Sequence, residues 1–266
     1  MQVSRSSAYT RPYNPLYCLM PKKYAQPPIV EAACDFRFSP DSAWDWTIAG
    51  LLYERVKGEF PTKEQVDVVD FVATPLGTSG PHTNVSARIR LVREERDALL
   101  QLGPQLFTVN QLRPYPEWPK FKEVILTNFH HYLKVAEPRG FARIGLRYIN
   151  RIPLPESTVN LNDYFNSLPK VAEPIPQVFK GFLMQVEVPY GELKSSLRIV
   201  LGTVPPDSEA KYPVLLDLDM YAQESDCPMI GDVEMWLDAA HQSVEEAFEA
   251  SITDTSRTEL FGEVKQ

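Results

Sequence analysis

The chain has 266 residues, of which 44% are hydrophobic, 11% aromatic and 23% charged. This composition is typical of a globular protein, and it excludes wholesale disorder, collagen and coiled coil. The net charge of -8 and the pI of about 5.2 argue against a protein that binds duplex nucleic acid through a strongly basic domain.

The charge is divided unevenly along the chain. Up to Asn150 there are 19 Lys and Arg against 15 Asp and Glu, a balance of +4, whereas the remainder has 8 against 20, a balance of -12. Opposite surface potentials of this kind attract a charged partner, a second copy or each other. The asymmetry therefore concerns association and says nothing about the fold.

Cysteine content and hydropathy bear on the cellular environment. The three cysteines, Cys18, Cys34 and Cys227, include no closely spaced pair, so neither a disulfide framework nor a structural zinc site is indicated. No apolar run approaches the roughly 18 to 20 residues of a membrane span, and the N-terminal residues lack the apolar stretch of a signal peptide. We expect a cytoplasmic protein that does not associate with membranes.

The first half of the chain begins with an arm and continues with strands and helices. Residues 1–28 are rich in Pro and Tyr and have no period, which indicates an extended arm. Residues 29–38 alternate strictly between apolar and polar side chains, which predicts a half-buried strand with Glu31, Asp35 and Arg37 on its polar face. A helix up to Lys57 follows, starting at Asp41 or Ser42, then strands at about 66–73, 85–92 and 98–109 and a helix over 118–136.

The same order of elements then recurs. An alternating strand at 143–152 is followed by a weak helical segment at 161–168, strands at about 182–188, 196–202 and 214–221, and a helix that begins at Asp232. The prediction is an α+β fold of two tandem β-α-β-β-β-α units, 29–139 and 140–254, after the arm at 1–28 and before a C-terminal tail at 255–266. Antiparallel sheets with helices on one face resemble the duplicated saddle of TATA-binding-protein-like folds, and paired ferredoxin-like units are the alternative.

The polar face of this predicted sheet is the main candidate for function. If the two opening strands meet at the centre of the sheet, Glu31 and Asp35 face Arg147 and Arg151 as cross-strand ion pairs. The alternative is an arginine-lined surface for a carboxylate, a phosphate or an acidic peptide, because the guanidinium fork suits planar anions. The candidate binding residues on or next to this face are Glu31, Asp35, Arg88, Arg90, Arg147, Asn150 and Arg151.

A metal site is the competing hypothesis for chemistry. Asp217 and Asp219 fall on one face of a predicted strand, with Glu187 expected on a neighbouring strand, and such carboxylates could hold Mg²⁺. His241 is a candidate general base, although a histidine at the edge of an apolar stripe is more often a hydrogen-bonded boundary residue. No phosphate-binding glycine loop, zinc motif or nucleophile elbow is present. We therefore assign no catalytic residue and no cofactor.

One stretch carries a family resemblance. Leu146-Arg147-Tyr148-Ile149-Asn150-Arg151, together with Pro28-Ile29-Val30-Glu31-Ala32 and Leu216-Asp217-Leu218-Asp219, is similar to a sporadically distributed prokaryotic family of uncharacterised proteins of about this length. The resemblance implies an accessory protein, patchily distributed as defence-associated genes often are, and it implies no activity.

These observations favour a non-catalytic interaction or regulatory protein that binds a protein partner, or a second copy, through the charged sheet face. The alternative is a metal-dependent hydrolase or nuclease that uses Asp217, Asp219 and Glu187. A third hypothesis, single-stranded nucleic acid on Arg88, Arg90 and Arg147, requires an affinity that falls steeply with salt.

Overall fold

A computed structural model describes residues 22–71, 83–156, 158–178 and 180–264. The protein has an α+β fold dominated by one nine-stranded antiparallel sheet, with a second, two-stranded sheet where the described chain begins and ends. The strands of the large sheet are β2 (Ile29–Phe38), β3 (Thr62–Phe71), β4 (Thr83–Val92), β5 (Ala98–Gly103), β6 (Leu106–Leu112), β7 (Phe141–Pro153), β8 (Leu183–Tyr190), β9 (Ser195–Thr203) and β10 (Pro213–Gln223).

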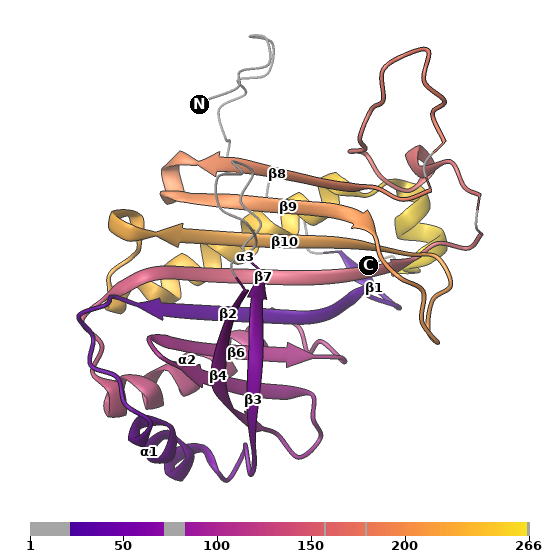
Figure 1. Cartoon of the computed structure of the whole chain (residues 1–266). Helices are drawn as coiled ribbons and strands as arrows, with labels where there is room; N and C mark the ends of the chain where they lie inside the picture. Colours follow the sequence, from indigo (N-terminus) through magenta and orange to yellow (C-terminus); the bar gives the residue numbers. More distant parts are fainter. Residues whose placement is uncertain (1–21, 72–82, 157, 179, 265–266) are drawn as a thin grey trace.

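The strand order places the two predicted opening strands side by side. The order is β3-β4-β5-β6-β2-β7-β10-β9-β8, so β2 and β7 pair at the centre, and consecutive strands extend outward from each of them. Figure 1 shows that β3 and β4 run across the direction of the central strands. The sheet is continuous across the boundary between the two predicted units because β2 pairs with β7 directly.

Three α-helices cover one face of the sheet: α1 (Thr47–Val56), α2 (Trp118–Ala136) and α3 (Val233–Ser251). In Figure 1 the helix α3 passes behind β10 and β9, so the view looks onto the opposite, open face. The core lies beneath the helices, where alternate residues of the central strands such as Phe36, Leu146 and Leu218 are fully buried against Phe121 and Leu237. No helix in the described part of the chain is long and apolar enough to cross a membrane.

The structure corrects two predicted elements. The expected strand at 98–109 is two strands, because Gly103-Pro104-Gln105 forms a tight turn in which Gln105 takes a positive φ of 49°. The expected helix at 161–168 is reduced to a 3-10 turn, Leu161–Asp163, capped by the side chain of Asn160. Asn, Asp and Ser compete for backbone hydrogen bonds in this segment, which disfavours a longer helix.

The other predicted strands and helices are present in the structure, but the first or last residue of most of them differs from the one predicted. The predicted loop at 77–81 and most of the predicted arm, 1–21, lie outside the described residues. Short 3-10 turns also occur at Gly191–Leu193, Glu224–Asp226 and Ile230–Asp232.

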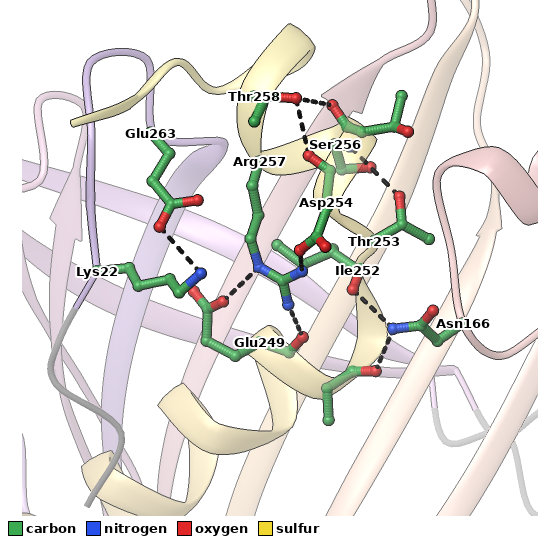
Figure 2. A network of polar contacts seen from close by, with 12 residues as sticks. Lys22, Asn166, Glu249, Ile252, Thr253, Asp254, Ser256, Arg257, Thr258 and Glu263 are labelled. Atoms are coloured by element: carbon green, nitrogen blue, oxygen red, sulfur yellow. Dashed lines mark hydrogen bonds and ion pairs between the residues drawn. The ribbon is translucent and has the colours of Figure 1, made fainter. Parts of the chain in front are cut away.

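The C-terminal residues are not a free tail, because they pack against the start of the described chain. Strand β1 (Lys23–Tyr24) pairs with β11 (Glu263–Val264), after a π-helical turn at Ser256–Leu260. Figure 2 shows Arg257 lying between Glu249 and Asp254, and its guanidinium donates to both carboxylates at 2.9 and 2.7 Å. Tyr24 donates to the other oxygen of Glu249 at 2.6 Å. This network fastens both ends of the described chain to the end of α3.

Candidate functional site

The open face of the sheet carries the charged side chains that the alternation predicted. On β2 the residues Ala32, Cys34 and Phe36 are buried towards the helices, and Glu31, Asp35 and Arg37 therefore point the opposite way. On β7 the open-face arginines are Arg143, Arg147 and Arg151. Asp217 and Asp219 on β10 and Arg198 on β9 share this face through the registers Asp217↔Ile149, Asp219↔Arg147 and Asp219↔Arg198.

Five of these side chains form a continuous series of ion pairs across four strands, which we call the arginine–aspartate chain. Arg143 donates through Nη1 to Asp35 and through Nη2 to Asp219, at 2.9 and 2.8 Å from the two oxygens of Asp219. Arg37 extends the series at one end, with its Nε 3.5 Å from Oδ2 of Asp35. Arg198 extends it at the other end, with its Nη1 3.5 Å from Oδ2 of Asp219. Three cations alternate with two anions, so the chain as a whole carries one positive charge.

The interior of the arginine–aspartate chain is shielded from water. Burial alone would lower the pKa of Arg143, but attraction to Asp35 and Asp219 outweighs burial and raises that pKa. Burial raises the pKa of the Asp219 carboxyl, which the neighbouring arginines oppose. Tyr221 lies beneath two of the guanidiniums, with the carbons of Arg143 and Arg198 at 4.9 and 5.1 Å from its ring centre.

A glycine makes room for the central ion pair. Gly145 lies opposite Asp35 on β2 and opposite Tyr221 on β10. A Cβ atom at Gly145 would lie 2.5 Å from Nη1 of Arg143 and 2.7 Å from Oδ1 of Asp35. The ion pair therefore occupies the space that a side chain at position 145 would fill.

Arg147 forms a separate, two-pronged ion pair beside this chain. Its Nε and Nη2 atoms donate to the two oxygens of Asp217 at 2.8 and 2.5 Å, the bidentate geometry that a guanidinium and a carboxylate prefer. The hydrogen bond to Asp217 raises the pKa of Arg147. The side chain of Arg147 is nevertheless 47% exposed, compared with 8% for Asp217, so the arginine presents its outer edge to solvent.

The predicted pairing of Glu31 and Asp35 with Arg147 and Arg151 is wrong in its partners. The register places Ala33 opposite Arg147 and Ile149 opposite Glu31, so the acids of β2 are not directly opposite those two arginines. Arg147 instead pairs with Asp217, and Arg151 pairs at 2.7 Å with Asp207, which lies outside the sheet. Arg143 and Arg147 both take a partner from β10, but neither acid is directly opposite its arginine, since the register places Gln223 opposite Arg143 and Asp219 opposite Arg147.

A second series of hydrogen bonds crosses the other half of the open face, and we call it the amide relay. Arg90 donates to Gln101 at 3.1 Å, Gln101 donates to Asn110 at 2.9 Å, and Asn110 donates to Glu31 at 2.6 Å. The relay joins β4, β5, β6 and β2, and its two amides are buried. Sequence reasoning missed Gln101 and Asn110, because a single strand was predicted at 98–109 and the pairing of β5 with β6 was not expected.

The two remaining predicted binding residues, Arg88 and Asn150, lie on opposite faces of the sheet. Arg88 is half-buried on the same face of β4 as Arg90. Asn150 is buried on the helix-covered side, where its amide donates to the carbonyl of Leu216 at 3.1 Å. Asn150 therefore ties β7 to β10 and takes no part in the open face.

The geometry opposes the metal hypothesis. Asp217 and Asp219 do share a strand face, but each is engaged by an arginine, and Arg198 lies between Asp219 and Glu187 in the register of β10, β9 and β8. Cationic guanidiniums occupy the positions where a metal ion would have to bind. Within the described residues no group of three or more acidic, histidine or cysteine side chains is arranged to hold a metal ion.

His241 is enclosed between α2, α3 and β7. The ring of Trp118 stacks on the His241 ring at 4.3 Å, and Tyr148 shares a hydrogen bond of 3.0 Å with Nδ1 of His241. The Tyr148 hydroxyl is also 2.9 Å from that of Tyr115. Burial lowers the pKa of His241 to about 4, so the imidazole is neutral near pH 7. His241 is thus a hydrogen-bonded residue on the helix-covered side of β7, on the opposite face from the arginine–aspartate chain.

Cys34 is fully buried on the helix-covered face of β2. Burial raises the pKa of its thiol, which keeps the sulfur protonated and disfavours a nucleophilic role.

Comparison with known proteins gives no relative. No family model, no curated protein and no solved structure matches this chain.

Proposed function

We propose that this protein is a non-catalytic binding protein of a prokaryotic accessory system, and that its open sheet face binds an acidic surface of a protein partner. The observation that carries the proposal is the exposure of three arginines on a sheet face that none of the described helices covers. Arg37 is 54% exposed, Arg147 47% and Arg198 39%, and all three are anchored by carboxylates that are mostly buried.

Arg147 suits recognition because its two hydrogen bonds to Asp217 already order the side chain before a partner binds. Arg147 uses Nε and Nη2 on Asp217, which leaves the Nη1 side of its planar fork directed away from that carboxylate. Among the described residues, Arg37 and Arg198 each have a single carboxylate within ion-pair distance, at 3.5 Å. A carboxylate-bearing partner surface could therefore gain charge-assisted hydrogen bonds without disrupting the buried pairs.

A protein partner is favoured over single-stranded nucleic acid by the local charge balance. The arginine–aspartate chain carries only one excess positive charge, and Arg147 is matched by Asp217. Nucleic-acid binding grooves rely on a larger excess of cations and on exposed aromatic rings for stacking, whereas Tyr221 is buried beneath the arginines.

We further infer that the scaffold consists of two diverged copies of one module related through the β2–β7 pair, as in TATA-binding-protein-like saddles. The central pairing of the two opening strands and the outward progression of strands from each support this inference. The copies differ by one strand and one helix, since four strands follow α1 whereas three follow Leu161–Asp163.

Affinity purification from nuclease-treated extracts of the source cell tests the proposed function. The wild-type chain is compared with Arg37→Glu, which reverses an exposed charge, and with Arg139→Glu, a matched reversal at a residue that is 73% exposed and lies outside the open face. We expect a protein that co-purifies with the wild type and with Arg139→Glu but not with Arg37→Glu. Equal recovery of a protein with all three chains would contradict the proposal. So would a protein that the wild type recovers only from extracts without nuclease treatment.

A further inference from the structure

A groove lies between α1 and the strands β3 and β4 at one end of the sheet, on the helix-covered side and away from the arginine–aspartate chain. Its volume is about 810 Å³. One wall contains Trp46, Gly50 and Tyr53, and the strands contribute Lys63, Ile89 and Leu91. Figure 1 shows α1 beside the ends of these two strands at the margin of the fold.

The groove exists because one side of α1 packs into the core, whereas the side that carries Gly50 has no side chain to fill the space next to it. Ile48, Leu52 and Val56 are buried, and α1 packs mainly against α2. Gly50 is on the side that faces the strands, and a Cβ atom there would meet no atom within 4 Å. The helix is thus held at a distance from β3 by its packing against α2.

The walls of the groove are apolar and aromatic at several points. Leu91 is fully buried at the base, Ile89 is half-buried, and Trp46 keeps 49% of its surface exposed beside them. Covering an exposed indole and an aliphatic surface removes apolar area from water, which favours binding. Apolar side chains of a ligand therefore have a place to bind.

The charges around the groove leave one cation without a carboxylate. Glu54 is paired with Lys57 at 2.6 Å, and Glu64 is paired with Arg96 at 2.9 Å. Lys63 forms no ion pair with any described residue, and its ammonium lies 4.2 Å from the centre of the Tyr53 ring. The uncompensated charge at this point selects a ligand with an anionic group.

β3 is also the outermost strand of the sheet. Among the described strands its only neighbour is β4, so the backbone N–H and C=O groups along its outer edge have no strand partner. An unpaired edge beside a helix-walled groove is the arrangement in which proteins add an extended peptide to a sheet.

We propose that this groove binds an extended peptide, which adds to the edge of β3 as a further strand. Alternate apolar side chains of the peptide enter the space next to Trp46 and Leu91, and a carboxylate of the peptide pairs with Lys63. The backbone edge accounts for a peptide rather than a small aromatic acid, which could use Trp46 and Lys63 but could not pair with β3. This binding site is independent of the function proposed for the open face.

Selection from a library of random peptides displayed on phage tests the proposal, with the intact protein as bait. The blocking variant is Gly50→Trp, whose new side chain fills the groove, and the matched control is Gly58→Trp, at a glycine that also has no neighbour within 4 Å but lies outside the lining. The most enriched peptide is then synthesised, and its affinity is measured for each chain. A version with its acidic group replaced by an amide is measured in parallel.

We expect enriched peptides with alternating apolar residues and a carboxylate, a loss of affinity of at least about tenfold with Gly50→Trp, and little change with Gly58→Trp. Lys63→Gln should weaken the acidic peptide and leave the amide version unchanged. Hydrogen exchange of the β3 amides should slow when the acidic peptide binds. The proposal is overturned if no peptide is enriched, if Gly50→Trp binds as well as the wild type, or if the β3 amides gain no protection.

Discussion

Arg143 on β7 and Asp219 on β10 are joined by two hydrogen bonds from a single guanidinium nitrogen, at 2.9 and 2.8 Å, where only 6% of Asp219 is exposed. The same guanidinium reaches Asp35 on β2 through its other terminal nitrogen. One arginine therefore links the two central strands of the sheet to a third, and it does so on the face that we propose for partner binding.

Removing the carboxylate of Asp219 should be strongly destabilising. Asp219→Asn leaves Arg143 mostly buried with one anion fewer, and breaking a buried ion pair on one side costs about 3 to 5 kcal/mol. Asp207→Asn is the matched control, because Asp207 pairs with Arg151 but is 50% exposed, so solvent screens its charge and its loss should destabilise the protein less. Urea denaturation of the two variants gives the comparison, and equal losses would mean that Asp219 is not held as described.

Gly145→Ala should displace the ion pair between Arg143 and Asp35. The added methyl group would lie within 2.7 Å of both side chains, and forcing extra volume into a packed site costs about 1 to 3 kcal/mol. Gly140→Ala is the control, because a Cβ atom at Gly140 meets no atom within 4 Å. The prediction fails if thermal denaturation finds Gly145→Ala as stable as Gly140→Ala.

Asn110→Ala should interrupt the amide relay. It removes the acceptor of the Gln101 amide and a donor to Glu31, and an unsatisfied buried polar group costs about 1 to 3 kcal/mol. Thr108→Val, at another buried position on the same face of β6, changes the volume little and should have a smaller effect. Free energies of unfolding from urea titrations decide between these outcomes.

Acid should destabilise the protein through His241. The pKa of His241 is lowered from 6.5 to about 4 in the folded protein, so between these pH values the unfolded chain binds more protons than the folded one. Stability is therefore fully present above pH 6.5 and falls as the pH decreases towards 4, by up to about 3 kcal/mol at 1.36 kcal/mol per pKa unit. His241→Gln, which keeps an acceptor for Tyr148 but does not titrate, should have a shallower loss over this range. Identical pH profiles of the melting temperature would refute this assignment.

The alternation of β2 and β7 was enough to predict which of their side chains lie on the open face. That the two strands meet was only a condition of the expected ion pairs, and the partners expected on that condition were wrong. The partners of Arg143 and Arg147 depend on the register with β10, a strand more than 60 residues away along the chain, and no local pattern encodes it. Asn150 alternates onto the covered face of β7, yet it was counted among the binding candidates because it belongs to the Leu146–Arg151 motif.

The amide relay and the α1–β3 groove were beyond sequence reasoning for different reasons. Gln101 and Asn110 look like ordinary polar positions of half-exposed strands until the strands are aligned. The groove arises because α1 packs against α2, which depends on tertiary packing rather than on the residues of α1 alone. The missed turn at Gly103-Pro104, by contrast, carried a clear local signal.

The most direct test of the central claim is hydrogen–deuterium exchange of this chain in the complex recovered by affinity purification, compared with the free chain. Partner binding at the open face should slow exchange in peptides from β2, β7 and β9, which carry Arg37, Arg147 and Arg198, and the surface of α3 should be unaffected. Protection confined to α3 or to the other helices, with no change in β2, β7 and β9, would contradict the account.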